Sequence, residues 1–372
     1  VTTFTAKSAG GAVTGAVLEI GADGSYKLTL NAPVVHDQPG KTEENETLSI
    51  NFTVTDGDGD TATGQLQVRV NDDTPDAKGL VIERTVLDDE AQTLFIPTNP
   101  GADLGGDVSQ NYKMATGSAG ALFAAGADGV KSVSVSGSFD VIYKDANGFA
   151  QTTTVSWGAG VPGANGVTTF SAVSAGGAVT GAVLEIRADG SYKLTMMAPV
   201  AHGFAFPGIE EDETLSIRFT VTDGDNDTSS GWLKVLVNDD TPTPIASVEF
   251  ASTVLDDEAQ ALFAGNNTPD DGVANVSIAE GDKGSLFSAG ADGVSKVSIF
   301  DAGFKVIYSQ GGFAKVEGIE WSAGVQGPGG ATTFTATGKD SGQTAAVWTI
   351  NADGSYKFEL KAPVAHDKNS AT

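Results

Sequence analysis

The strongest constraint on this chain is internal repetition at a period of about 165 residues, because each copy of such a repeat folds as one unit that packs against its neighbours. The segment "DGSYK" begins at Asp23, Asp189 and Asp353. The segment "NDDTP" begins at Asn71 and Asn238. If "NDDTP" closes each copy, the chain contains the end of one repeat (residues 1–75), one complete repeat (76–242) and the beginning of a further repeat (243–372).

The hydrophobic pattern within each copy predicts β-strands. Apolar and polar residues alternate in "SYKLTL" from Ser25, in "TLSINFTVT" from Thr47 and in "QLQVRV" from Gln65. A period of two places alternate side chains on opposite faces, as in the half-buried strands of a sandwich. Gly- and Asp-rich segments such as "GADG" supply the turns, and "LDDEAQ" is the one candidate for a helical turn. We therefore expect an all-β fold.

The amino-acid composition limits the classes of partner that this chain could bind. The net charge is −27, and Lys and Arg together number 21 among 372 residues, which argues against nucleic acid and anionic membrane surfaces. A negative chain favours divalent cations, although solubility alone is the simpler alternative. The absence of cysteine excludes disulfides, thiolate metal sites and cysteine catalysis. No apolar run approaches the ~18 residues of a membrane span, so we expect no membrane insertion.

The acidic residues gather in short motifs, of which the first is "DGDGD" at Asp56, with its counterpart "DGDND" at Asp223. An EF-hand starting at Asp56 would need Gly and Glu where the chain has Thr61 and Gln67. Glycosidase carboxyls would need a sugar-sized gap that this turn does not offer. A calcium site and a solvated Asp-Gly turn remain open. Mutual repulsion of about 1 kcal/mol per pair at ~4 Å in water favours the calcium site.

Further acidic runs lie near the ends of the repeat. "NDD" follows the last predicted strand, "DDE" comes shortly after it in the next unit, and "EENE" or "EEDE" precedes the strand that leads into "DGD". A cation bound between two successive units would stiffen their junction, but each run alone is equally well explained as a polar loop. The spacing does not say which runs share an ion. The "DDE" candidates are Asp88, Asp89, Glu90, Asp256, Asp257 and Glu258.

Longer stretches around these motifs resemble a known family. They are "LEIGADGSYKLTLNAPVVH" from Leu18, "ETLSINFTVTDGDGDTATGQLQVRVNDDTP" from Glu46, and the copies of both at Leu184 and Glu213. In combination they resemble the tandem repeat of the giant RTX-type surface adhesins and biofilm proteins that bacteria export by type I secretion. "VNDDTP" is also similar to the "NDN-x-P" ending of cadherin-like modules, whose linker aspartates bind calcium.

The resemblance implies an elongated array of tandem Ig-like or cadherin-like β-sandwich repeats. It further implies an extracellular, calcium-dependent rod that extends a ligand-binding tip from the bacterial cell surface, with calcium ions and neighbouring repeats as partners. The third copy ends at Thr372, before its own "DGD" and "NDD" motifs. Carried over by position, the calcium candidates are Asp56, Asp58, Asp60, Asn71, Asp72, Asp73, Asp223, Asp225, Asp227, Asn238, Asp239 and Asp240.

The sequence bears on three classes of function: an enzyme, a binding module and a spacer. An enzyme is disfavoured, because each repeat has one histidine, His36, His202 or His366, and no zinc pair or catalytic triad is evident. We expect each histidine to make a local hydrogen bond instead. A carbohydrate- or surface-binding module for host or matrix glycans is the alternative, with aromatic rings as its candidate contacts. Repetition favours a spacer, since reach needs many units, and we expect a calcium-stiffened extension segment of an adhesin.

The tryptophans bear on the binding alternative. Trp157 and Trp321 occupy the same repeat position, in "SWGAGV" and "EWSAGV", which indicates a place in the core. Trp232 stands at an outward-facing strand position where the first copy has Gln65. We expect a neighbouring loop to cover it.

Overall fold

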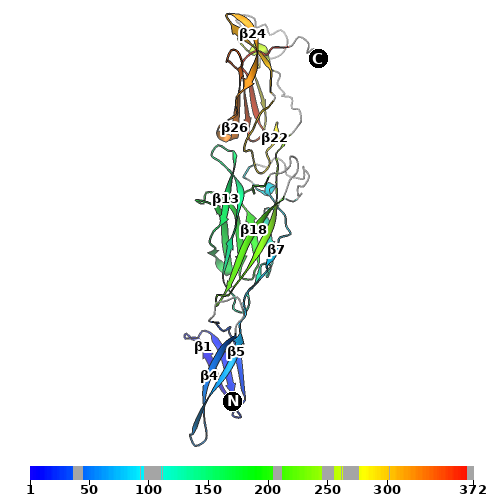
Figure 1. The fold of residues 1–372 in the computed structure, drawn as a ribbon. Helices are drawn as coiled ribbons and strands as arrows, with labels where there is room; N and C mark the ends of the chain where they lie inside the picture. The colour runs from blue at the N-terminus through cyan, green and yellow to red at the C-terminus, as the bar shows by residue number, and fades with distance from the viewer. Residues whose placement is uncertain are drawn as a thin grey trace.

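The structure is a computed structural model that describes residues 1–36, 45–92, 94–95, 110, 112–203, 212–244, 255–260, 262, 276–300 and 302–366. The chain is all-β, as the period-two pattern predicts. Its three units follow one another end to end in an elongated array (Figure 1). The described segments contain no helix with the length and apolar character that a membrane span requires.

The first unit has two antiparallel sheets. One is three-stranded, in the order β1-β2-β3, and the other is the long hairpin of β4 and β5. The turn between β4 and β5 carries "DGDGD" and lies at the end of the array farthest from the third unit (Figure 1). The strands are β1 Thr2–Lys7, β2 Thr14–Ile20, β3 Tyr26–Leu30, β4 Asn45–Thr55 and β5 Thr61–Asn71.

The second unit is a sandwich of two sheets. The five-stranded sheet has the order β11-β18-β19-β7, with β8 also paired to β19, and the seven-stranded sheet has the order β12-β13-β15-β16-β17-β9, with β14 paired to β15. Neighbouring strands are antiparallel, except that β7 and β8 run parallel to β19. The strands are β7 Leu80–Ile82, β8 Leu87–Asp88, β9 Met114–Gly117, β11 Val130–Ser136, β12 Ser138–Lys144, β13 Ala150–Trp157, β14 Val161–Pro162, β15 Val167–Ser174, β16 Thr180–Arg187, β17 Tyr192–Met196, β18 Asp212–Asp223 and β19 Thr228–Asn238.

The described part of the third unit repeats the seven-stranded sheet of the second. Its order is β21-β28-β27-β26-β24-β23, with β25 paired to β26. Each strand occupies the repeat position of a strand in the second unit, so that β26 corresponds to β15 and β27 to β16. The strands are β21 Ile278–Gly281, β23 Lys305–Gln310, β24 Phe313–Trp321, β25 Val325–Gln326, β26 Ala331–Gly338, β27 Thr344–Asn351 and β28 Tyr356–Leu360.

Short elements stand where one unit passes into the next. Two-residue strands pair at equivalent places in the second and third units, β6 with β10 and β20 with β22. The helical turn predicted at "LDDEAQ" is present in both copies as a 3₁₀ turn, η1 and η3. The bounds are β6 Asp76–Ala77, β10 Phe123–Ala124, β20 Thr243–Pro244, β22 Phe287–Ser288, η1 Asp89–Ala91, η2 Ala164–Gly166, η3 Asp257–Ala259 and η4 Pro328–Gly330.

Alternation along the strands builds the core of the second unit. Inward-facing residues of β18 and β19 pack against inward-facing residues of β15, β16 and β17, and polar residues between them face outward. The buried set includes Phe170, Leu184, Leu194, Leu215, Ile217, Phe219, Val221, Leu233, Val235 and Val237. These apolar contacts fix the direction of β19, whose two ends carry the acidic motifs.

The first unit exposes residues whose counterparts are buried in the second. Phe52 is 43% exposed, whereas Phe219 at the same repeat position is 1% exposed. The sequence of the first unit begins at Val1, which corresponds to Val167 at the start of β15. In the second unit β18 pairs with β11 as well as with β19, and Val135 of β11 lies opposite Phe219, whereas β4 in the described first unit pairs with β5 alone.

Phe219 and Phe52 form a matched pair for a test of the core. Phe219→Ala removes a fully buried ring and is expected to destabilise the second unit by about 3–5 kcal/mol. Phe52→Ala removes an exposed ring from the same strand position and should cost the first unit clearly less. Hydrogen exchange resolved by segment would measure both effects, and equal losses of protection in the two variants would contradict the assigned core.

Candidate metal sites at the junctions between units

The acidic motifs of one unit lie at opposite ends of that unit. In the second unit the "DGDND" loop joins β18 to β19, and "NDD" stands where β19 ends. β19 has 11 residues, so at ~3.3 Å per residue the two motifs are about 35 Å apart. One ion cannot contact both motifs, and each motif instead meets the adjoining unit.

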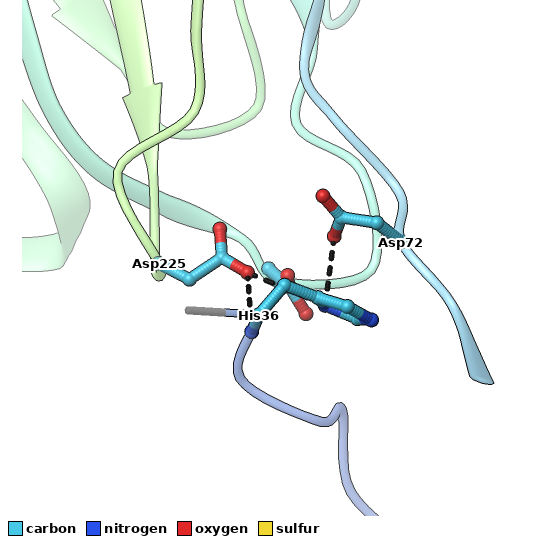
Figure 2. A group of neighbouring side chains, drawn as sticks. His36, Asp72 and Asp225 are labelled. Carbon is cyan, nitrogen blue, oxygen red and sulfur yellow. Dashed lines mark hydrogen bonds and ion pairs between the residues drawn. The ribbon is translucent and has the colours of Figure 1, made fainter. Parts of the chain in front are cut away.

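The first junction, between residues 1–75 and residues 76–242, gathers four ionisable side chains. His36 and Asp72 come from the first unit, and Asp128 and Asp225 come from the second. One potential ligand atom of each lies within 4.8 Å of those of the others. His36 Nδ1 is 3.0 Å from Asp72 Oδ1 and 3.5 Å from Asp225 Oδ2, so the cluster spans the boundary between units (Figure 2).

A second group at this junction consists of carboxylates alone. Asp223, Asp225 and Asp227 of the "DGDND" loop are buried, and their oxygens also lie within 4.8 Å of one another. Asp223 Oδ1 accepts main-chain hydrogen bonds from Asn226 at 3.1 Å and Asp227 at 2.7 Å. The buried Oδ2 of Asp223 accepts none. Because Asp225 belongs to both groups, the junction offers two adjacent cation positions that share one carboxylate.

The same loop is present in the first unit without a covering neighbour. Asp56 Oδ1 accepts from the main-chain N–H groups of Asp58, Gly59 and Asp60 at 3.3, 3.1 and 2.9 Å. All three aspartates are exposed, yet their oxygens form another possible metal group. Gly59 has a φ of 102°, and Asn226 has a φ of 93° at the same place in the second unit. The loop geometry therefore does not require the adjoining unit.

The second junction, between residues 76–242 and residues 243–366, repeats the histidine cluster. His202, Asp239 and Asp292 are grouped in the same way, with Asp292 supplied by the third unit. His202 Nδ1 is 3.2 Å from Asp239 Oδ1 and 3.5 Å from Asp89 Oδ2. Asp89 thus adds a carboxylate from the "DDE" run. No third-unit "DGD" loop stands here, because the 372 residues end before that motif.

The last aspartate of "NDD" ties adjacent units together through the main chain. Asp73 Oδ2 accepts a hydrogen bond from the main-chain N–H of Ala127 at 2.7 Å. Asp240 Oδ2 accepts one from Ala291, at the same repeat position of the next junction. Both N–H groups belong to "AGADGV" turns, so these two carboxylates connect one unit to a turn of the following unit.

The "DDE" run holds the loop that carries the histidine. Asp89 Oδ2 accepts from the main-chain N–H of Val200 at 2.9 Å, and Asp257 Oδ1 accepts from Val364 at 2.8 Å. Asp88 Oδ1 accepts from the N–H of Glu90 at 2.9 Å and caps η1. Asp89 therefore positions the segment of His202 and also faces the ring.

The other predicted metal residues have varied surroundings. Asn71 is exposed, whereas Asn238 is buried and donates from Nδ2 to Asp212 Oδ1 at 3.1 Å. Asp256 is buried in the third unit. The side chain of Glu258 lies outside the described part of the structure. Asp256 is not a member of the described groups of histidine and acidic side chains above.

Burial and mutual repulsion raise the pKa of the clustered carboxyls. Burial, with the charge of Asp292, raises the pKa of Asp89 well above its ordinary value. Burial and the neighbouring Asp239 do the same for the pKa of Asp292. Burial and the hydrogen bond that protonated Asp223 donates to Asp225 raise the pKa of Asp223 to about 6. A divalent cation would reverse this penalty, since it favours the ionised form of each group.

The same clusters also raise the pKa of the histidines. A raised pKa favours the charged form of an imidazole, whereas it favours the neutral form of a carboxyl. Burial lowers the pKa of His202, but the hydrogen bond and charge of Asp239 outweigh it and raise the pKa to about 9. The pKa of His36 is also raised, because the carbonyl of Val70 and the charge of Asp72 outweigh burial. Both junctions therefore favour a positive charge at the ring.

Four residues of these clusters are not predicted by the acidic motifs of the sequence. Asp128 and Asp292 stand in the repeated segment "LF-x-AGADGV", which marks a turn and gives no sign of what the turn contacts. His36 and His202 were expected to make only local hydrogen bonds. Their Nε2 atoms do face the carbonyls of Val70 and Val237 at 3.3 and 3.0 Å, but Nδ1 faces the acidic cluster. The presence of one histidine at the same position of each copy was the signal that could have indicated a role in the clusters.

Comparison with known proteins adds no assignment, since no family model and no curated protein matches this sequence.

The glycine of the "AGADGV" turn provides a test of the contact between units. A Cβ on Gly126 would lie 2.9 Å from Asp73 O, and one on Gly290 would lie 2.7 Å from Asp240 O. Gly126→Ala and Gly290→Ala should therefore separate the units and speed hydrogen exchange in the "AGADGV" turns. Gly120→Ala is the control, because Gly120 has the same left-handed φ of +73° but open space around it. Equal exchange in all three variants would contradict a close junction.

Proposed function

We propose that this chain is a calcium-stiffened extension segment of a secreted bacterial cell-surface adhesin that takes part in attachment or biofilm formation. The observation that carries the proposal is that each junction joins acidic side chains of two successive units in one buried cluster. A cation bound there would link the units and oppose bending between them. The bacterial cell surface and the adhesin context come from the family resemblance of the repeat.

The donor set of the first junction suits calcium. Calcium takes six to eight oxygen ligands in flexible geometry, from carboxylates and main-chain carbonyls. Asp225 adjoins Asp72 of the first unit, and Asp223, Asp225 and Asp227 together provide three carboxylates from one loop. These residues would hold the ion, whose charge would offset the repulsion between them.

Main-chain contacts at the second junction also support a stiff rod. The N–H of Ala150 donates to Val294 O at 3.0 Å, and the N–H of Gly330 donates to Asn147 O. Phe149, in the same turn between β12 and β13, is fully buried. The second and third units therefore meet through a turn of one unit as well as through the carboxylates.

The alternative is a module that binds carbohydrate on an aromatic face. Trp157 is buried beside Phe139, and Trp321 and Trp348 pack against each other with ring centroids 6.4 Å apart. Trp232 is 43% exposed, so the expectation that a loop covers it is wrong. One exposed indole does not make an aromatic platform, and the spacer is therefore the preferred proposal.

Calcium removal should soften the rod and lower its stability. At 100 times Kd, an ion is worth about 2.7 kcal/mol to the folded state, and extracellular calcium modules often have Kd values of about 10⁻⁴–10⁻³ M. We expect EDTA to lower the melting temperature and to broaden the distance distribution from small-angle X-ray scattering. Calcium in excess of EDTA should restore both, and profiles unchanged by chelation would overturn the proposed stiffening.

A matched pair of variants separates junction binding from surface binding. Asp225 and Asp58 occupy the same place in the two "DGD" loops, but Asp225 is buried at the first junction and Asp58 is exposed at the free end. Asp225→Asn should reduce the effect of calcium on melting and scattering, because it removes a charge shared by both cation positions. Asp58→Asn should leave the effect on scattering unchanged. The opposite ranking would contradict a site between units.

A further inference from the structure

The junction histidines have one ring nitrogen that a calcium site does not explain. His36 Nε2 is 3.3 Å from Val70 O, and His202 Nε2 is 3.0 Å from Val237 O. A carbonyl oxygen only accepts, so Nε2 carries hydrogen in both rings. In the neutral imidazole, Nδ1 then has a free lone pair. Both lone pairs face the acidic cluster of their own junction.

Burial makes this orientation significant. The side chains of His36 and His202 are 6% and 4% exposed, and in the neutral ring neither Nδ1 has a hydrogen-bond partner. Each Nδ1 nevertheless has two carboxylates within 3.5 Å, Asp72 and Asp225 in the first junction. A lone pair facing carboxylate oxygens is repulsive; in the metal-free junction a proton on Nδ1 relieves this repulsion, and a bound metal ion would take the place of that proton.

Imidazole nitrogen with carboxylate oxygen is a donor set for transition metals. Calcium takes oxygen ligands, whereas zinc and neighbouring divalent ions bind imidazole together with carboxylate. A metal-binding histidine usually donates its other N–H to a carbonyl or carboxylate, which fixes the tautomer. His36 and His202 have this arrangement with Val70 and Val237.

The same arrangement occurs at both junctions with ligands from both units. His36 and Asp72 face Asp128 and Asp225 of the next unit, and His202 and Asp239 face Asp292 of the next unit. Asp225 also belongs to the all-carboxylate group with Asp223 and Asp227. The first junction thus has a nitrogen-containing position directly beside an oxygen-only position.

We propose that the histidine cluster at each junction is a site for a divalent transition-metal ion of the zinc class, which at the first junction lies adjacent to the oxygen-only calcium position. The inference rests on the proposed function in that the junctions hold cations, and it adds a second ion of different chemistry. Because its ligands come from consecutive units, this ion would also connect those units. The chain would then respond to zinc-class ions even when calcium is abundant.

The third histidine is an internal control. His366 is 79% exposed, and its Nε2 is 3.0 Å from Asp257 Oδ2. The third-unit strand that would correspond to that of Val70 and Val237 is not among the 372 residues. His366 belongs to no metal group in the described part of the chain. It therefore lacks both the fixed tautomer and the buried carboxylates.

The test uses the complete 372-residue chain, stripped with chelator and held in millimolar calcium. Zn²⁺ is titrated by calorimetry, and Co²⁺ is titrated by visible absorption, which reports ligand type and geometry. We expect two tight equivalents per chain, one per junction. His36→Ala and His202→Ala should each lose one equivalent, or weaken it at least tenfold, and His366→Ala should keep both. Calcium-dependent scattering of each variant checks that the array is still folded.

The outcomes distinguish this inference from the proposed function. Zn²⁺ binding that is the same in the His36→Ala, His202→Ala double variant and in His366→Ala would overturn the inference, as would complete displacement of Zn²⁺ by millimolar calcium. Zn²⁺ binding that depends on His36 and His202, in a rod that calcium neither stabilises nor stiffens, would support the inference and overturn the calcium proposal. Calcium stiffening without histidine-dependent Zn²⁺ binding would support the calcium proposal and overturn the inference.

Discussion

Repulsion among buried carboxylates is the interaction on which the arrangement of this chain depends. Asp89 and Asp223 are fully buried next to other aspartates. Each like-charged pair at ~4 Å costs about 4 kcal/mol at an effective dielectric of 20, and burial adds a desolvation penalty. Hydrogen bonds from main-chain N–H groups satisfy some of the oxygens, but they do not remove the net charge. Contact between units is therefore favoured by a proton or a cation that offsets this charge.

This repulsion bears on how the repeat places acidic motifs of adjacent units together. The core contacts of Phe219 and its neighbours hold β19 along the unit, so an acidic motif stands at each end of the same strand. Asp72 of one unit meets Asp225 of the next, although 153 positions separate them in the sequence. Each unit thus carries two half-sites, and a half-site is completed by the neighbour. Tandem repetition is what assembles the two histidine clusters, whose side chains come from two units, whereas each "DGD" group lies within one unit.

The sequence predicted the secondary-structure elements of this chain better than the contacts between them. Period-two alternation predicts β18 and β19 because it reflects burial on one face of a strand, a local property. The "DGD" loop is likewise local, since Asp56 and Asp223 bond their own turns. Asp128 and Asp225, both of the second unit, meet Asp72 only when the units dock, and nothing in the spacing encodes that contact. For the histidines the pattern indicated one hydrogen bond. The surroundings of Nδ1 were not predicted, because the carboxylates that it faces come from distant segments of the sequence.

The two copies of the "DGD" loop show where the free energy of cation binding would go. The exposed loop at Asp56 and the buried loop at Asp223 share two main-chain hydrogen bonds to the first aspartate, from the third and fourth residues after it. A loop that is already ordered loses little conformational entropy when it binds an ion. Most of the binding free energy is then available for docking one unit against the next, which is what a stiffened rod requires. Substitutions that loosen this turn would weaken the junction without removing a single ligand.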